Sequence, residues 1–225
     1  MRRSFLRDNG RSLFFLAIFL AAIIGQAFAG YANENERLAQ HGRSSISFWD
    51  FIGSSRFLVD VAENWQSEFL QFSLFIFATV WLVQRGSSES KKVGDEGLES
   101  DREQLVGRHA RADSPAWARV GGWRTAVYSN SLLIVMVGVF ALSWLAQSLG
   151  GLVVANEELA EHGMPAQSWA EYLVSPDFWN RTLQNWQSEF LAVGAMTAFA
   201  ILLRQRGSAE SKPVGAPHEE TETSG

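Results

Sequence analysis

The sequence predicts an all-α membrane protein with four transmembrane helices, arranged as two tandem, parallel two-helix repeats. A duplication with a constant offset, charge-free apolar runs and unevenly placed basic residues lead to this prediction. Hydrophobic residues make up 47% of the 225 residues, yet the mean hydropathy is −0.04, so apolar and polar residues must be segregated into blocks. Nine Trp and sixteen Phe suit membrane spans with interfacial aromatic belts better than a small soluble core.

The duplication is clearest in the string Asn-Trp-Gln-Ser-Glu-Phe-Leu, which occurs at 64–70 and again at 185–191. The same offset of 121 residues pairs Asn9 with Asn130 and the segment 84–91 with the segment 205–212. Self-similarity at a fixed period is the signature of repeated structural units. We therefore expect a first repeat over 1–94, a second over 122–215, a flexible linker over 86–120 that overlaps the first repeat's end, and a disordered tail over 213–225.

Four apolar runs supply the expected spans. Those at about 12–32 and 131–152 carry no charge and are long enough for a hydrocarbon layer of about 30 Å at 1.5 Å per residue. Those at about 66–84 and 187–204 are shorter, and they suffice if Arg85 and Arg204 extend to the interface. Aromatic residues in the two outer loops, among them Trp49 and Trp169, predict short amphipathic helices lying in the interface.

The first span has an alternative interpretation as a cleaved signal peptide. It follows a basic start and ends near Ala27-Phe28-Ala29, which is typical of such a peptide. The same segment recurs at 131–151, where a signal peptide cannot lie. The duplication therefore favours a retained anchor.

Basic residues set the expected orientation. They gather before the first span, in the linker and at the start of the tail, including Arg2, Arg3, Arg7 and Arg11, whereas the loops between paired spans are poorer in them. The positive-inside rule then places both termini and the linker in the cytoplasm. Each repeat enters and leaves on one side, which makes the repeats parallel.

Eight polar residues at equivalent positions form the candidate ion site or interhelical polar site. Asn64 and Glu68 share a helix face because they are four residues apart, and Glu68 and Glu189 approach each other if the repeats are related by a near-twofold axis. The structural interpretation is favoured, because such residues satisfy backbone groups at a helix start, form turns before Gly, or bond between helices. The candidates are Glu68, Glu189, Asn64, Asn185, His41, His162, Gln26 and Gln147.

Composition and motifs limit the expected activities. The net charge of −5 offers no basic face for nucleic acid. No hydrolase or phosphate-binding motif occurs and no span carries a mid-membrane charge, so we expect no catalytic residue, metal or cofactor and no proton-coupled transport. The expected partners are the lipid bilayer and either another membrane protein or further copies of the chain.

Three motifs are distinctive: Arg2-Arg3-x-Phe5-Leu6-Arg7-x-Asn9-Gly10, the two Asn-Trp-Gln-Ser-Glu-Phe-Leu strings, and Gln-Arg-Gly-Ser-x-Glu-Ser-Lys after each second span. They resemble a family of bacterial multi-pass membrane proteins, the domain of unknown function DUF6766, over essentially the whole chain. The resemblance implies a multi-pass protein of the bacterial inner membrane and supplies no activity.

The leading functional hypothesis is a non-enzymatic scaffold, partner-binding or envelope-modulating protein. The alternative is a small channel or carrier with its pathway between the repeats and Glu68 and Glu189 at its outer mouth. A third, weaker hypothesis is a membrane-embedded enzyme that uses His41 and His162 with nearby carboxylates.

Overall fold

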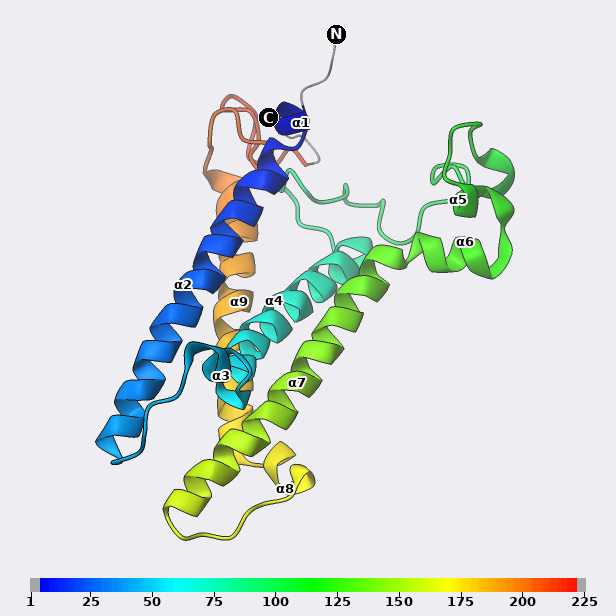
Figure 1. Cartoon of the computed structure of the whole chain (residues 1–225). Coiled ribbons are helices and arrows are strands. Elements are labelled where there is room, and N and C mark those ends of the chain that lie inside the picture. The colour runs from blue at the N-terminus through cyan, green and yellow to red at the C-terminus, as the bar shows by residue number, and fades with distance from the viewer. Residues whose placement is uncertain (1–4, 222–225) are drawn as a thin grey trace. The chain divides into compact units, whose positions relative to one another are not determined.

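The computed structural model describes residues 5–221, and every regular element in that range is a helix (Figure 1). The long helices are α2 (Gly10–Gln40), α4 (Ser55–Trp81), α7 (Ser131–Glu161) and α9 (Pro176–Leu202). The short ones are α1 (Phe5–Asp8), α3 (Phe48–Ile52), η1 (Gly107–His109), α5 (Ala116–Val120), α6 (Gly122–Ser129) and α8 (Trp169–Leu173). The predicted all-α class is confirmed, while the basic residues Arg2 and Arg3 and the last four residues of the predicted tail lie outside the described range.

By length and hydropathy, two of the described helices can cross a membrane rather than the predicted four. These are α2 and α7, whose most apolar windows have mean hydropathies of 2.3 and 2.1. Helices α4 and α9 fall short because their first halves, up to and including the Asn-Trp-Gln-Ser-Glu string, are rich in polar and charged residues. Length and hydropathy thus give weak support for a membrane protein. They support the predicted first and third spans but not the second and fourth.

The helix boundaries differ from the predicted spans. The predicted spans to 84 and 204 run too far, because α4 ends at Trp81 and α9 at Leu202. The backbone N–H of Gln84 donates to Ser90 Oγ at 2.8 Å and that of Gln205 donates to Ser211 Oγ at 2.9 Å. A serine hydroxyl thus replaces the helical carbonyl as acceptor and the helix stops.

The predicted linker contains regular local structure. Residues 86–120 include the single turn η1 and the short helix α5. Lys91 Nζ donates to the carbonyl of Gly97 at 2.7 Å and pairs with Glu99. These turns fold the segment locally, and its flexibility as a whole stays a prediction.

The described chain divides into two compact units, and each contains parts of both copies of the duplication. The first unit holds the described residues up to Val61 together with Ala146–Trp169. The second holds Ala62–Leu145 and the described residues from Ala170 onward. Compactness therefore does not follow the boundary between the two sequence copies.

In the first unit, α3 packs against α2 through Phe51. Ser47 begins α3 with a capping box: the Asp50 backbone N–H donates to the Ser47 hydroxyl, and the Ser47 backbone N–H donates to the Asp50 carboxylate. Phe51 is buried against Gly30, where an added Cβ would lie 2.7 Å from the Phe51 ring. The opposite side of α3 carries Trp49, which is 78% exposed. This short helix thus has one packed and one open face.

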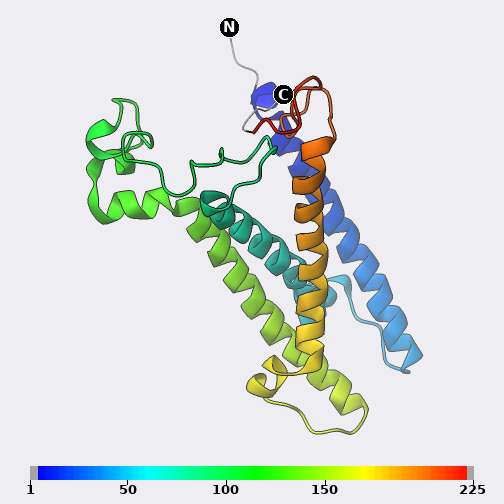
Figure 2. The same cartoon turned by 180° about the vertical axis from the view of Figure 1, so that it is seen from behind.

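In the second unit, α4 and α9 run in the same direction. Arg181 near the start of α9 pairs with Glu63 of α4, and Trp186 of α9 donates to Gln66 of α4. The two helices diverge toward their C-terminal ends in both views (Figures 1 and 2). Aromatic packing adds to these contacts, since the Trp144 ring lies 5.9 to 6.1 Å from the rings of Phe178, Trp179 and Trp186.

Equivalent residues of the two copies make the same local contacts. The Nδ2 groups of Asn9 and Asn130 donate to the carbonyl four residues earlier, at 2.9 and 2.8 Å. The Oδ1 atoms of Asn35 and Asn156 accept from the backbone N–H eleven residues later, both at 2.8 Å. The same asparagine at equivalent positions therefore makes the same local contact 121 residues apart.

Candidate functional site

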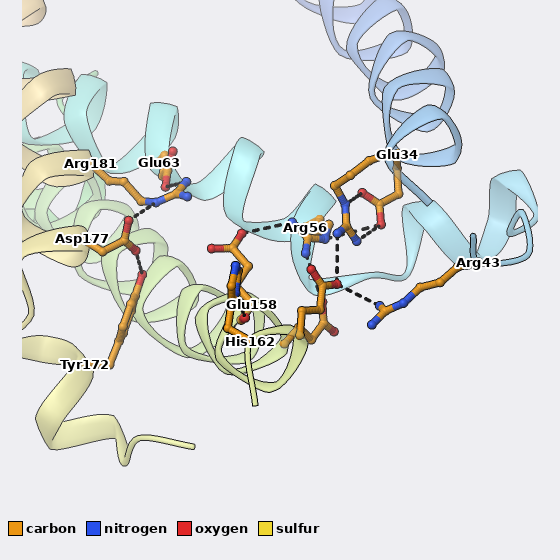
Figure 3. A network of polar contacts seen from close by, with 12 residues as sticks. Glu34, Arg43, Arg56, Glu63, Glu158, His162, Tyr172, Asp177 and Arg181 are labelled. Carbon is orange, nitrogen blue, oxygen red and sulfur yellow. Dashed lines mark hydrogen bonds and ion pairs between the residues drawn. The ribbon is translucent and has the colours of Figure 1, made fainter. Parts of the chain in front are cut away.

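The first unit holds a cluster of ion pairs at the ends of α2 and α7 and the start of α4 (Figure 3). Arg56 is at its centre, with its guanidinium 3.5 Å from Glu34, 3.4 Å from Glu157 and 3.7 Å from Glu158. Arg37 bonds Glu34 at 2.9 Å and, with Arg43, also reaches Glu161. Cations of the first sequence copy thus pair with carboxylates of the second.

The second unit has a polar chain that joins α8, the start of α9 and Glu63 of α4 (Figure 3). The buried Tyr172 hydroxyl donates to Asp177 at 3.4 Å, and Arg181 donates to Asp177 and to Glu63 at 3.2 Å each. Burial raises the pKa of Tyr172, so the phenol stays protonated. A polar recess of about 340 Å³ adjoins this chain and is also lined by Asn185.

A larger groove lies where α4 and α9 diverge. It has a volume of about 450 Å³, and its walls come from the C-terminal halves of both helices and from the turn after α4. Apolar side chains dominate the walls, among them Phe72, Phe75, Leu82, Val193 and Met196. The polar lining residues on the helices are Gln71, Thr79 and Thr197, and those at the turns are Gln84, Ser87, Ser88, Glu89, Ser90 and Glu210. The groove is thus mostly apolar along the helices and carries its carboxyl groups at the turns.

The repeated Gln-Arg-Gly-Ser-x-Glu-Ser-Lys motif builds those turns. In the first copy Ser90 Oγ accepts from the Gln84 N–H and donates to the Lys91 carbonyl at 2.9 Å. In the second copy Ser211 makes the equivalent bonds to Gln205 and Lys212. Each hydroxyl closes a short loop and holds the glutamate before it at the end of the helix.

Gly86 is required at the first of these turns. Its φ of +86° lies in the left-handed region, and an added Cβ would collide with the His218 carbonyl. Its N–H donates to Thr221 Oγ1 at 3.0 Å, so the turn after α4 lies directly on the segment that follows α9.

Glu89 and Glu210 meet between the two motif turns. Their side chains share a hydrogen bond, which requires a proton on one carboxyl group. This bond, with smaller contributions from partial burial and from the charge of Glu210, raises the pKa of Glu89 to about 7. The two groups occupy equivalent positions of the duplication, so the same motif supplies both carboxyl groups.

Lys212 anchors the second motif. It is buried, and its Nζ donates to the carbonyls of Pro217, His218 and Glu220 at 3.2, 2.7 and 3.2 Å. Burial lowers the pKa of this amine, while the three carbonyls satisfy all its donors. The segment after α9 is thereby folded back over the end of the helix.

The predicted carboxylate pair and its asparagines fall in the second unit. Glu68 and Glu189 lie close enough for their charges to interact. Asn64 is exposed and belongs to the α4 face that carries Glu68, whereas Asn185 donates to the Arg181 carbonyl at 3.0 Å and lines the polar recess. The charge of Glu189 thus acts on Glu68, and Asn185 has a structural hydrogen bond of its own.

The predicted histidines and glutamines fall in the first unit. The Nδ1 atoms of His41 and His162 lie 2.8 Å from the carbonyl four residues earlier, which is the geometry of a helix-ending turn. Gln26 is partly buried and Gln147 fully buried. Over residues 5–221 no group of three or more His, Cys, Asp or Glu has the arrangement of a metal site.

The sequence prediction missed the ion-pair cluster and the Glu89–Glu210 pair. The signal for the first was present in the duplication, since Arg37, Arg56 and Asp60 stand opposite Glu158, Asp177 and Arg181. Opposite charges at equivalent positions indicate two copies that pair with each other. The signal for the second was the repeated motif itself, which puts a glutamate at both helix ends.

These features define an all-helical protein with two helices apolar enough to cross a membrane. The chain belongs to the family described as a domain of unknown function (DUF6766), whose model matches residues 2–223. Comparisons with curated proteins and with solved structures found no match.

Proposed function

We propose that the chain is a four-span protein of the bacterial inner membrane that acts as a non-enzymatic scaffold or partner-binding protein. The uncovered apolar surface of α2 carries the proposal, since only 6% of its most apolar window is buried. A continuous apolar surface of this size is stable against lipid or a partner and unfavourable in water. The exposed side chains include Phe14, Phe15, Leu16, Ile18, Phe19 and Leu20.

Helices α4 and α9 are proposed as the second and fourth spans. After Glu68 and Glu189 neither helix carries a charge, which leaves thirteen residues or about 20 Å in each. Large apolar side chains are exposed along both stretches, including Phe72, Phe77 and Phe199. The Trp and Glu before each stretch suit an interfacial position, and local thinning of the bilayer accommodates a short span.

The parallel arrangement of the repeats is supported by α4 and α9 running in the same direction. Glu63 meets Arg181 in the N-terminal halves of the two helices, and Glu89 meets Glu210 in the turns that follow them. Equivalent segments of the two copies thus meet at both levels, as they do in parallel repeats. Both termini then lie on the cytoplasmic side with the linker, as the basic flanks indicate.

Single cysteines test the topology, because the chain contains none. We expect S45C and A166C to react with an impermeant maleimide from outside intact cells, and D95C to react only after permeabilisation. If α2 and α7 alone crossed the membrane, D95C would react from outside and A166C would be protected. That pattern would overturn the four-span proposal.

The partner-binding role is tested by mild crosslinking in native membranes followed by purification. We expect a defined adduct with a second copy or with another membrane protein, which a charge introduced at an open apolar position, such as W49E, weakens. A chain that runs as a monomer at all crosslinker concentrations and returns no adduct would contradict a scaffold role.

A channel or carrier is the second candidate function, and the proximity of Glu68 and Glu189 favours it. Two carboxylates at one place attract cations to an outer mouth. In proteoliposomes a cation flux that falls in the E68Q/E189Q variant would support it. A flux equal to that of the parent chain, or no flux in either, would remove these residues from any pathway.

A further inference from the structure

The groove of the second unit holds an uncommon set of polar groups at the motif turns. Glu89 and Glu210 share one proton there, and Ser88 lines the same groove. Ser88 is 8% exposed, and its Oγ is buried without a hydrogen-bond partner among residues 5–221. A buried hydroxyl without a partner is unfavourable and points to a group that the groove receives.

We propose that this groove binds a bilayer lipid whose headgroup ends in a primary ammonium, held by Glu89, Glu210 and Ser88. An acyl chain of the lipid lies along the apolar walls. The proposal rests on the membrane placement proposed above, and it adds a ligand class to it.

The headgroup chemistry follows from the donors and acceptors. A primary ammonium has three N–H donors and no acceptor, which matches two carboxyl groups and one hydroxyl oxygen. On binding, the shared proton leaves to solvent and the ammonium takes its place between the two carboxylates. A trimethylated ammonium carries the same charge and no N–H, so it cannot make these bonds.

The direction of the lipid acyl chain follows from the position of the groove. Its apolar walls lie on the charge-free halves of α4 and α9, which the proposed topology places in the hydrocarbon layer. The carboxyl pair lies just beyond the helix ends, at the level of lipid headgroups. A volume of about 450 Å³ also falls within the range of roughly 300–1,000 Å³ typical of small-molecule sites.

The two motif turns, 84–91 and 205–212, differ at one position. Ser88 of the first motif is replaced by Ala209 in the second. S88A therefore gives the first motif the sequence of the second and removes one acceptor without disturbing the turn. It is the most conservative change available.

Native mass spectrometry of the full chain in detergent tests the proposal, with dioleoyl phosphatidylethanolamine and dioleoyl phosphatidylcholine as probes. We expect the ethanolamine lipid to bind at least about tenfold more tightly, as the loss of charge-assisted hydrogen bonds implies. E89Q/E210Q should abolish this preference and S88A should reduce it. The matched control E96Q/E103Q, at acidic positions outside the groove, should keep it.

A substitution that fills the groove distinguishes recognition of the lipid headgroup from recognition of its acyl chain. A78F narrows the wall of the groove and should weaken both lipids equally. Equal affinity for the two headgroups in the parent chain, or a preference unchanged in E89Q/E210Q, would overturn the proposal. The cysteine topology experiment would be unaffected by either result, so a failure here is distinguishable from a failure of the four-span arrangement.

Discussion

The two copies of Asn-Trp-Gln-Ser-Glu-Phe-Leu have the same sequence and different surroundings. Ser67 and Ser188 both donate to the asparagine carbonyl three residues earlier at 2.9 Å. Gln66, however, is fully buried and accepts from Trp186 at 2.8 Å, whereas its counterpart Gln187 is exposed. Local geometry follows the repeated sequence, while burial follows the contact between the two copies, which uses Gln from one and Trp from the other.

Among substitutions at equivalent positions, we expect those at the motif glycines to differ most in their effect on the free energy of unfolding. Both Gly86 and Gly207 have a positive φ, of +86° and +81°, so alanine strains either turn by about 1–3 kcal/mol. At Gly86 the added Cβ also meets the His218 carbonyl, whereas space is open at Gly207. We expect G86A to lower the free energy of unfolding clearly more than G207A.

Tryptophan fluorescence during unfolding in detergent measures this difference. Equal losses for G86A and G207A would show that the segment after α9 does not lie on the turn after α4.

A smaller difference is expected at the buried glutamine. Q66L removes the acceptor of the Trp186 indole and should cost about 1–3 kcal/mol of unfolding free energy. Q187L changes an exposed side chain and should stay within about 0.5 kcal/mol of the parent. The same unfolding assay compares them, and a Q187L effect as large as that of Q66L would contradict the asymmetry.

The ion-pair cluster around Arg56 should contribute less to the free energy of unfolding than the buried Gln66 does. Arg56 is 18% exposed at the side chain and faces three carboxylates, so R56Q should cost about 1 kcal/mol at low salt. High salt should shrink the effect because it screens partly exposed pairs. R102Q in the linker, at an exposed position, is the control. An R56Q effect that does not change with salt would argue for a packing role of the side chain.

We expect the smallest change in stability when a change of pH titrates the Glu89–Glu210 pair. The pKa of Glu89 rises from 4.5 to about 7, so the folded chain keeps a proton that the unfolded chain releases. The stabilisation is complete below pH 4.5 and is lost as the pH rises through about 7. Amide hydrogen exchange of the segment 84–91 should therefore be slower at pH 5.5 than at pH 8 after correction for the intrinsic rate.

E89Q should remove this pH dependence. Glu99 gives the contrasting case, since its hydrogen bond with Lys91 lowers its pKa and its stabilisation is lost only as the pH falls below 4.5. A pH response in E89Q equal to that of the parent would assign the effect to another group.

The sequence predicted the helical class and the approximate places of the long helices well. Charge-free apolar runs and His-Gly at helix ends depend on neighbours a few residues away, and such features can be read from a single chain. The expected helix-start role of Asn64 and Asn185 was wrong, because both lie inside α4 and α9. The helix ends were misplaced because Ser90 and Ser211 accept from Gln84 and Gln205, a bond that apolar periodicity does not reveal.

The candidate site was predicted only in part. An approach of Glu68 and Glu189 was expected from the duplication with an assumed axis; their charges interact, and a shared site stays a prediction. The Glu89–Glu210 pair and the unpartnered Ser88 depend on how two helix ends diverge and how the following turns fold back. No local propensity encodes that arrangement.

The repeated Asn-Trp-Gln-Ser-Glu-Phe-Leu by itself determined a duplication and two equivalent helix segments, because short-range hydrogen bonds and apolar spacing are properties of the local chain. Only the tertiary structure decided which copy buries its glutamine, which charges pair across the copies and where two carboxyl groups share a proton. Those outcomes depend on distances between residues about 120 positions apart, as for Gln66 and Trp186. Such distances are set by the packing of whole helices and not by the residues alone.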